Sequence, residues 1–386
     1  MQFEKKFLTE LNRCYATGQI EYNGERLALL ATEGEGACFA YAAPDYDQQR
    51  IVWSAPGGTM SFVPLSGTNG EFLSNQKFFR MFQWEEATIV WVRPQADGTF
   101  AVKELFTLPY IHRFDVLTAA DGSQYFIGCT LATKKETKED WSSPGKIYVA
   151  ELPADLNQPI HLTVLKDGLT QNHGYSRVTW NGHEASMVGA REGAFIVTPP
   201  AAAGQDWTIE QIMDWPVSDL AAIDLDGDGE LEIATIEAFH GQYYRIYKLK
   251  GGHYERIYEH PEASEFYHVV VSATLRGRPA FIGGCRRGKM QLFCVTAADS
   301  AGCGAGCGAR NGAGVGGAAE AEAEISSGTG MVGQSESQAA VLTLETTLID
   351  EGVGPSNVSV INEADRDVIV SANREKGEAA LYFVTD

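Results

Sequence analysis

The sequence predicts an all-β fold, a seven-bladed β-propeller that uses residues 1–386 as a single domain. Seven hairpins support this fold class, and six of them place an X-Gly turn between two apolar stretches, a strong short-range hairpin signal. Successive turns lie roughly 45 to 60 residues apart, the spacing of propeller blades, apart from one longer gap. No long stretch shows the 3.6-residue period of an amphipathic helix. The six turns are Asn23-Gly24, Asn69-Gly70, Asp121-Gly122, Asn181-Gly182, Asp228-Gly229 and Arg276-Gly277.

The chain is expected to begin and end in the same blade. Residues 3–8 resemble the stretches 207–212 and 254–258, which the repeat places as outermost strands. Residues 379–384, at the other end of the chain, are expected to form a third strand. The N-terminal strand therefore closes the C-terminal blade, which removes the exposed strand edges that an open ring would leave.

The blades between these ends follow in order. Blade three carries a charged run, residues 133–140, between its second and third strands, and we interpret this run as a solvated loop. The seventh hairpin joins residues 358–361 to 368–370. The repeat places blades one, two, four and five over residues 26–53, 61–106, 175–213 and 219–258.

Blade six accounts for the longer gap. It begins near Val269 and is interrupted after Val295. Residues 297–340 are rich in Gly, Ala, Ser and Glu and have few large apolar side chains. Such a composition cannot bury enough apolar surface to offset the entropy of ordering the chain. We expect residues 297–340 to be a disordered, low-complexity insert within blade six.

The composition restricts location and partners. The formal net charge is −21, which argues against nucleic acid and against an anionic membrane surface. The first residues lack an apolar segment of signal-peptide length, and no run of about 18 apolar residues could span a membrane. Seven cysteines, an odd number without regular spacing, suit a reducing compartment. We therefore expect a cytoplasmic protein.

Residues 224–232 alternate carboxylates with glycines, which points several hard oxygen ligands at one centre, as Ca²⁺ prefers. Thr235 stands where an EF-hand has a bidentate Glu, and the flanking stretches have the character of strands. The loop instead resembles the calcium loop of FG-GAP/VCBS-type repeats, the blades of integrin-α-like β-propellers. The resemblance implies a structural Ca²⁺ in this hairpin. The predicted ligands are the side chains of Asp224, Asp226, Asp228 and Glu232 and the carbonyl of Glu230.

Histidines recur where the innermost strands begin, and these strands line the centre of a propeller. His173 and His268 each lie nine residues before the hairpin glycine of their blade, and His112 lies ten residues before its own. Because strand side chains alternate with period two, this difference of one residue would turn His112 away in a regular strand. His240 joins the same face from the loop between strands two and three of blade five. We predict that these four histidines converge as metal ligands or bases.

Arginines occupy the same type of loop in other blades. Arg191 lies in blade four, Arg286 in blade six and Arg374 in blade seven. A planar guanidinium group suits bidentate recognition of a carboxylate or phosphate. Since the protein as a whole is strongly acidic, arginine and histidine gathered on one face predict the binding of a small anionic ligand, which we take to be a uronate-type sugar.

Two functions from different classes fit this pattern. In architecture and residue type it resembles the seven-bladed propeller lyases of the oligogalacturonate lyase group. The resemblance implies a second divalent metal at the histidine cluster and β-elimination beside a carboxylate, with histidine as ligand or base. The alternative is a non-catalytic propeller module that binds a protein or glycan on the same face. The sequence shows no Ser-His-Asp arrangement and no dinucleotide fingerprint.

Overall fold

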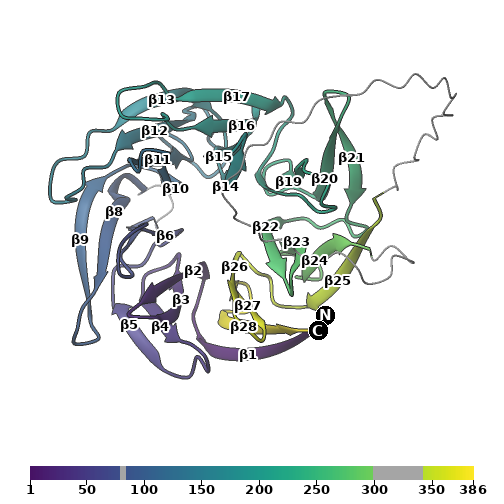
Figure 1. Cartoon of the computed structure of the whole chain (residues 1–386), viewed down its shortest axis with the longest axis horizontal. Coiled ribbons are helices and arrows are strands. Elements are labelled where there is room, and N and C mark those ends of the chain that lie inside the picture. Colours follow the sequence, from purple (N-terminus) through teal and green to yellow (C-terminus); the bar gives the residue numbers. More distant parts are fainter. Residues whose placement is uncertain (79–83, 299–341) are drawn as a thin grey trace, which may run out of the picture.

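The computed structural model describes residues 1–78, 84–298 and 342–386, and it confirms the seven-bladed β-propeller (Figure 1). Within these residues, twenty-eight strands form seven four-stranded antiparallel sheets arranged as a ring. The one helix in the described residues is the 3-10 turn η1 (Trp84–Glu86). None of the described helices is long and apolar enough to span a membrane.

The first four blades use their strands in chain order. Contacts between the first strands of neighbouring blades, such as β14 with β18, place these strands at the centre of the ring. Blade one contains β2 (Cys14–Tyr22), β3 (Glu25–Thr32), β4 (Cys38–Ala42) and β5 (Gln49–Trp53), and blade two contains β6 (Phe62–Pro64), β7 (Phe72–Gln76), β8 (Thr88–Pro94) and β9 (Phe100–Thr107). Blade three contains β10 (Ile111–Thr118), β11 (Gln124–Thr130), β12 (Gly145–Glu151) and β13 (Thr163–Leu169), and blade four contains β14 (Gly174–Trp180), β15 (His183–Ala190), β16 (Gly193–Thr198) and β17 (Thr208–Met213).

The last three blades continue the pattern until the ring closes. Blade five contains β18 (Asp219–Ile223), β19 (Glu232–Glu237), β20 (Tyr243–Lys250) and β21 (His253–Glu259), and blade six contains β22 (Tyr267–Leu275), β23 (Arg278–Cys285), β24 (Leu292–Ala297) and β25 (Leu344–Asp350). Blade seven contains β26 (Asn357–Asn362), β27 (Asp367–Asn373), β28 (Glu378–Thr385) and, from the other end of the chain, β1 (Gln2–Glu10). All but the first two residues of the predicted insert over 297–340 lie outside the described residues.

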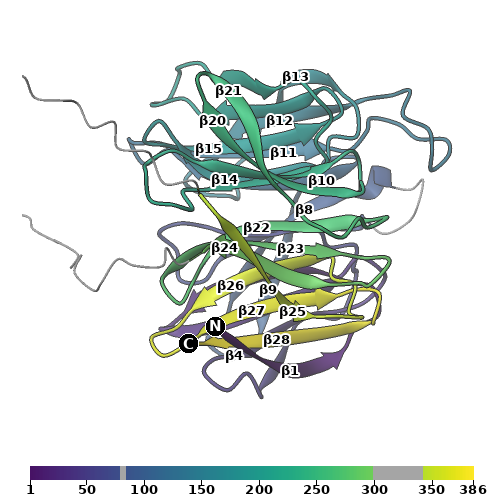
Figure 2. The same cartoon turned by 90° about the vertical axis from the view of Figure 1, so that its right-hand side faces the viewer.

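Closure by the N-terminal strand is confirmed. β1 pairs antiparallel with β28, from Gln2 opposite Thr385 to Glu10 opposite Glu378. Figure 2 shows the two strands side by side, with the two termini close together. The pairing covers the edge of β28 that would otherwise be open at the point where the chain begins and ends.

The hairpin turns have the backbone conformation that their residues favour. Both residues of Asn23-Gly24, Asn181-Gly182 and Arg276-Gly277 have positive φ, between 49° and 80°. This is the signature of a type I′ turn, whose twist matches that of the paired strands. The turns therefore fix the register of the strands that carry the site.

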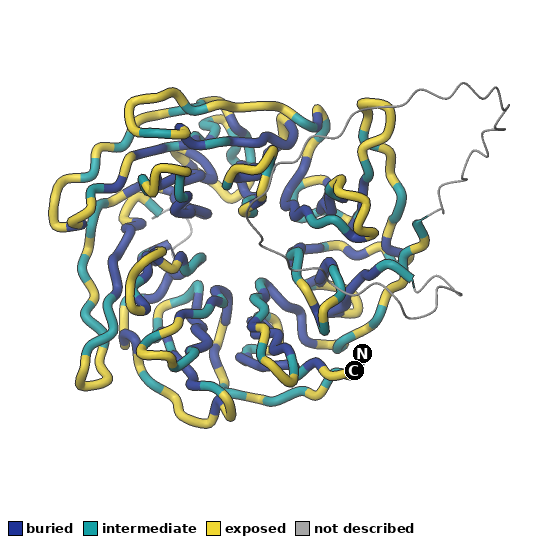
Figure 3. Tube along the Cα trace, in the orientation of Figure 1, coloured by how far each residue is buried: buried dark blue, intermediate teal, exposed yellow. Residues whose placement is uncertain are grey.

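The apolar core lies between neighbouring blades. Leu27 and Leu29 of blade one, for example, pack in one cluster with Phe72, Val90 and Val92 of blade two. Figure 3 shows that burial is greatest along the inner strands and that exposure is greatest at the turns and outer strands. The innermost strands are thus held rigidly on both sides, which suits them to position a site.

Candidate functional site

Four ring-bearing side chains stand where the innermost strands of four blades begin, at the same end of the ring. They are Tyr15, His112, His173 and His268, and all four line one cavity. The three histidines were predicted, and Tyr15 was not. Its signal was nevertheless present, because Tyr15 lies nine residues before Gly24, the same spacing that His173 and His268 show to their hairpin glycines.

β-Bulges explain how these side chains reach a common centre. The Cα pairing of the first two strands skips Tyr15, His112 and His268, so each is an extra residue opposite its partner strand. A bulge redirects a side chain relative to the regular pleat. The extra residue in the spacing of His112 lies in its hairpin turn, where Ala119 bonds to Ser123, so the strand keeps the phase of the others. The ring centroid of His112 lies 4.4 Å from that of His173.

Backbone carbonyls orient two of the histidines. Nδ1 of His173 lies 3.2 Å from the carbonyl oxygen of Ser218, and Nδ1 of His268 lies 2.6 Å from that of Ser356. Each carbonyl belongs to the start of the next blade. Because a carbonyl oxygen only accepts, Nδ1 is the donor and Nε2 keeps an acceptor lone pair, which in His268 lies 3.3 Å from the Tyr15 hydroxyl. The same arrangement orients histidine ligands in metal sites.

His240 completes the histidine cluster, which we define as His112, His173, His240 and His268. His240 lies in the loop between β19 and β20, where its backbone N–H donates to Oγ of Ser218 at 3.0 Å. Its Nε2 lies 3.1 Å from Nε2 of His173. One ring nitrogen from each of His173, His240 and His268 falls within 4.8 Å of the others. Two nitrogens that are each about 2.1 Å from one ion lie roughly 3 to 3.5 Å apart, and the 3.1 Å between His173 and His240 fits a shared metal ion.

Burial keeps these imidazoles neutral. It lowers the pKa of His112, His240 and His268 well below the ordinary value, and it lowers the pKa of His173 to about 3. The guanidinium of Arg113 acts in the same direction on each of them. A neutral imidazole is the form that binds a metal or accepts a proton.

The cavity in front of the histidine cluster has a volume of about 630 Å³. Aromatic side chains form much of its wall, and Phe78 and Trp84 stack with ring centroids 4.8 Å apart. Charged groups line the rest. Cations outnumber carboxylates among them: Arg13, Lys135, Lys138, Arg286, Arg287 and Arg374 against Glu33 and Glu139. The cavity is thus cationic in a protein of strongly negative net charge.

Two of the three predicted arginines lie in this cavity. Arg286 pairs with Glu375, with 2.6 Å between Nη2 and Oε1, and Nε of Arg374 lies 2.8 Å from Oε1 of Glu33. Arg191 is exposed and does not line the cavity. β15 ends at Ala190 and β16 begins at Gly193, so Arg191 sits in a two-residue turn that is too short to reach inward.

The charged run over residues 133–140 is more than a solvated loop. Lys135 is buried, its Nζ donates to the carbonyl of Asp140 at 2.7 Å, and it lies 3.2 Å from the ring centroid of Trp141. Lys138 and Glu139 remain exposed. Lys135, Lys138, Glu139 and Trp141 line the cavity, and Asp140 does not. The run joins strands two and three, the same type of loop as those that carry Arg286 and Arg374, and that position was the available signal.

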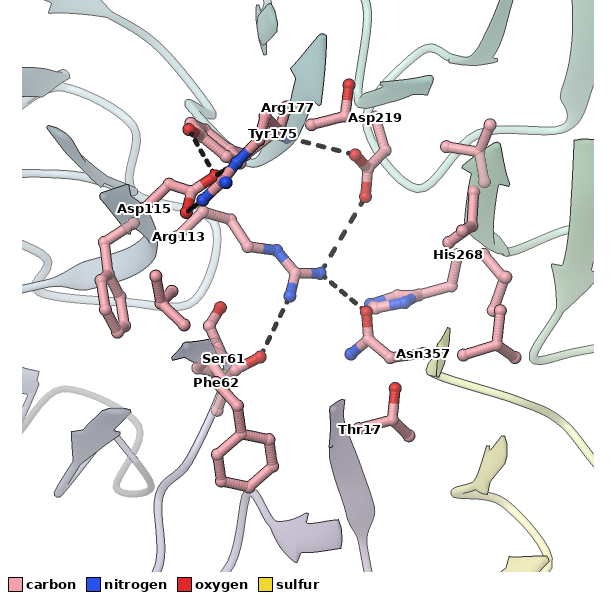
Figure 4. Close-up of a pocket in the computed structure, with 18 residues that line it drawn as sticks. Thr17, Ser61, Phe62, Arg113, Asp115, Tyr175, Arg177, Asp219, His268 and Asn357 are labelled. Carbon is pink, nitrogen blue, oxygen red and sulfur yellow. Dashed lines mark hydrogen bonds and ion pairs between the residues drawn. The ribbon is translucent and has the colours of Figure 1, made fainter. Parts of the chain in front are cut away.

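A second cavity, of about 250 Å³, lies along the innermost strands beneath the histidine cluster (Figure 4). Arg113 reaches across it and donates to the carbonyl of Met60 and to Oδ1 of Asn357, both at 3.1 Å. Oδ2 of Asp219 lies 4.0 Å from Arg113 and 3.9 Å from Nδ1 of His173. Burial raises the pKa of Asp219 to about 7, against the opposing effect of Arg113. This charged layer supports the histidines from below, and the sequence analysis did not identify it.

The acidic loop, residues 224–232, lies at the other end of β18. Asp224 accepts from the N–H groups of Gly227 and Gly229, and Glu230 donates its own N–H to Asp228. Oxygens of Asp224, Asp226 and Glu232 fall within 4.8 Å of one another, whereas Asp228 and Glu230 are not part of that group.

Lys248, from β20, places its ammonium among these carboxylates. Nζ lies 2.8 Å from Asp226, 2.8 Å from Asp228 and 2.7 Å from Glu232. Glu232 is fully buried. Calcium in the loop stays a prediction from the sequence, and it requires the ion to displace this ammonium.

Comparison with known proteins identifies the fold but no family. No protein-family model matches the sequence, and no curated protein sequence matches it. The likeness of the acidic loop to FG-GAP/VCBS repeats therefore rests on the loop residues alone.

Solved propeller structures are similar over nearly the whole chain. A catalytically inactive histidine-to-alanine variant of virginiamycin B lyase from Staphylococcus aureus, with quinupristin, has a TM-score of 0.53 at 10% identity, covering 99% of this chain and 100% of that one. The selenomethionine-substituted form of the same lyase gives 0.50 at 9%, with the same coverage. A luciferin-regenerating enzyme gives 0.44 at 12%, covering 76% of this chain and 88% of that one. At these identities the similarity establishes the propeller fold alone.

Proposed function

We propose that this propeller binds a divalent metal ion at His173, His240 and His268 and is a lyase that acts on a carboxylate-bearing ligand of uronate type. One observation carries the proposal: three neutral imidazoles bring ring nitrogens within 4.8 Å of one another inside a cationic cavity. Imidazole is the commonest protein ligand for such metals. Three protein ligands leave coordination positions for a substrate, as in catalytic metal sites.

A divalent ion at this position would act as a Lewis acid on the ligand's carboxylate and so ease removal of the neighbouring proton. The protein's own groups would hold that carboxylate. Arg286 and Arg374 line the same cavity as the histidines, and each is already paired with a glutamate. Because cations exceed carboxylates along the wall, a ligand carboxylate can join these pairs without leaving an unpaired buried anion.

β-Elimination needs one group to accept a proton and one to donate a proton. The proton leaves the carbon next to the carboxylate, its electron pair forms the C=C bond, and the bond to the leaving oxygen breaks. We assign the acceptor role to His112, which is neutral and lies outside the metal-binding group of three. The Tyr15 hydroxyl, 3.5 Å from Nε2 of His112, would protonate the leaving oxygen. The proton held by His112 then returns to Tyr15, which balances the cycle.

One structural neighbour supports a lyase rather than a binding module. Virginiamycin B lyase is a lyase on a propeller that spans this whole chain, and its inactive variant lacks one histidine. The stronger support comes from this chain itself, because its cavity has both a ligand-sized volume and converging polar groups.

The test is an elimination assay. Uronate oligosaccharides are incubated with the protein and with Mg²⁺, Mn²⁺, Zn²⁺ or Ca²⁺ in turn, and ultraviolet absorbance reports the unsaturated product. We expect metal-dependent absorbance, which the His173→Ala and His112→Ala variants lower by at least about 100-fold while their melting temperatures stay near that of the parent. If no metal gives a signal and His173→Ala binds the same sugars as the parent, the lyase assignment fails and the binding-module alternative replaces it.

A further inference from the structure

Four arginines line one side of the cavity in front of the histidine cluster. They come from blades six, seven and one, which are consecutive around the ring (Figure 1). Arg13 precedes β2 in blade one, Arg286 and Arg287 follow β23 in blade six, and Arg374 follows β27 in blade seven. We call these four residues the arginine cluster.

Three of these guanidinium groups share two carboxylate oxygens in the described part of the chain. Nη2 of Arg286 and Nη1 of Arg374 lie 2.6 and 2.9 Å from the same oxygen, Oε1 of Glu375. Oε1 of Glu33 accepts from Nε of Arg374 at 2.8 Å and from Nε of Arg13 at 3.0 Å. Because each oxygen is shared between two guanidinium groups, the ion pairs do not compensate all of the positive charge.

Arg287 is the fourth member of the cluster, and it has no ion pair within residues 1–78, 84–298 and 342–386. Its guanidinium lies 5.3 Å from the ring centroid of Phe266, and that of Arg286 lies 4.6 Å from the same centroid. Both guanidinium groups therefore approach one ring. The side-chain N–H groups of Arg287 have no acceptor among the described residues, so all of its donors are available to a ligand.

The charge of the arginine cluster favours a dianion over a monoanion. Four guanidinium groups against the carboxylates of Glu33 and Glu375 leave a surplus of two positive charges. Burial, and next the positive charge of Arg374, lower the pKa of Arg286, as expected where guanidinium groups repel each other. One carboxylate would neutralise half of the surplus, whereas a dianionic group would neutralise all of it.

We propose that the arginine cluster binds a tetrahedral dianion, the phosphate group, either as the free ion or as a monoester. Phosphate offers at least three terminal oxygens and can accept from guanidinium groups of several blades at once, whereas a carboxylate has two oxygens. Phosphate binding requires neither a metal nor elimination, and so goes beyond the proposed function. Because Arg286 and Arg374 would also hold the uronate carboxylate, phosphate and uronate should exclude each other.

The experiment compares four anions at constant ionic strength and about pH 8, where phosphate is a dianion. Phosphate and sulfate are tetrahedral dianions, dimethyl phosphate is a tetrahedral monoanion, and acetate is a carboxylate. Calorimetry measures their binding to protein that has been freed of metal by chelation and dialysis. We expect phosphate and sulfate to bind at least about tenfold more tightly than either monoanion, because they form more charge-assisted hydrogen bonds.

A sugar phosphate distinguishes the two sources of the phosphate group. Glucose 1-phosphate keeps the tetrahedral dianion and adds a sugar ring. If it binds more tightly than inorganic phosphate, the cluster is assigned to a phosphorylated ligand. If it binds more weakly, the cluster is assigned to the free ion.

Matched variants locate the bound anion. Arg287→Ala should lower phosphate affinity by roughly two- to fivefold, the range for an exposed charge pair, without changing the melting temperature. Arg286→Lys should lower the affinity further, because it keeps the charge but loses the planar fork. Lys138→Ala and Arg191→Ala are the controls and should leave phosphate affinity unchanged. Lys138 lines the same cavity from blade three, and Arg191 is exposed outside it.

Equal affinity for dianions and monoanions would overturn the inference, and so would the absence of phosphate and sulfate binding. Phosphate binding that Arg287→Ala and Arg286→Lys both leave unchanged would overturn it as well. Failure of the proposed function is a separate result, in which phosphate binds as described but no metal produces an elimination product from uronates. If both proposals hold, phosphate raises the KM of elimination and leaves kcat unchanged.

Discussion

The histidine cluster and the acidic loop lie at opposite ends of β18, and both bring metal-type ligand atoms within 4.8 Å of one another. They differ in what surrounds those atoms. The histidines are neutral, His173 and His268 are buried and oriented by backbone carbonyls, and the nearby charges are guanidinium groups. The carboxylates of the loop already contact an ammonium, that of Lys248, at 2.7 to 2.8 Å.

This difference shows that ligand type and spacing do not define a metal site by themselves. A neutral nitrogen with a free lone pair loses little when an ion arrives, and it has no competing cation. A carboxylate that already holds an ammonium must exchange one cation for another. We therefore expect the metal at the histidine cluster and a stabilising ion pair in the loop.

The largest expected effect is on turnover, which should depend on the histidine cluster and not on the acidic loop. His268→Ala should lower turnover in the elimination assay by at least about 100-fold, because it removes a ligand from the metal centre. Asp226→Ala in the acidic loop should leave turnover within about twofold. Kinetic measurement of both variants at equal concentration of folded protein checks the contrast. Similar losses in the two variants would contradict it.

Removing the Lys248 ammonium should show whether the acidic loop is stabilised by this ion pair. Lys248→Met leaves Glu232 buried with no counter-charge, which costs on the order of 3 kcal/mol of unfolding free energy. Denaturant unfolding in chelator measures the loss. We expect added Ca²⁺ to recover part of it in this variant and to leave the parent unchanged. A parent protein stabilised by Ca²⁺ to the same degree would show that the ion displaces Lys248, as the sequence predicts.

Stability should depend on pH through the histidine cluster. Burial lowers the pKa of all four histidines, that of His173 to about 3 from about 6.5, so the unfolded chain takes up protons that the folded protein refuses. The histidine contribution is therefore complete above about pH 6.5 and is lost progressively as the pH falls toward 3.

Asp219 opposes this trend. Its pKa is raised to about 7, so its contribution is lost as the pH rises from about 3.8 to 7. Because four groups act against one, the melting temperature of the metal-free protein should fall between about pH 7 and 4.5. His268→Gln should make the fall shallower. A melting temperature that rises on acidification in the parent would count against neutral histidines.

The smallest expected effect concerns a single carboxylate of the loop. Asp226→Ala removes one of the groups that contact Lys248, and Asp226 keeps a quarter of its side chain exposed. We expect a loss of about 1 kcal/mol or less, because water screens part of this pair. Thermal unfolding in chelator measures it. A loss as large as that of Lys248→Met would mean that Asp226, rather than Glu232, dominates the loop.

The fold could be predicted from the sequence because its signals are local. An X-Gly turn specifies a hairpin within a few residues, and the repeat of such turns specifies the ring. His173 and His268 could be predicted because each lies nine residues before its hairpin glycine, and Tyr15 has the same spacing. The spacing at His112 is one residue longer because its hairpin turn, between Ala119 and Ser123, has one residue more than the two-residue turns of blades one and six, so the phase of the strand is unchanged.

Other parts of the site depend on contacts between distant strands. Lys248 reaches the acidic loop from β20, and Arg113 meets Asn357 across the ring. Neither contact leaves a spacing signal. Arg191 lies outside the cavity for a different reason, since its loop, between β15 and β16, is shorter than the loops that carry Arg286 and Arg374 toward the cavity.

The most direct test of the metal assignment is elemental analysis of the purified protein, combined with anomalous scattering from crystals grown with Mn²⁺ or Zn²⁺. We predict one strong anomalous peak bonded to Nε2 of His173 and to ring nitrogens of His240 and His268, with Lys248 still in contact with Glu232. A peak among the carboxylates of residues 224–232, with none at the histidines, would contradict the account.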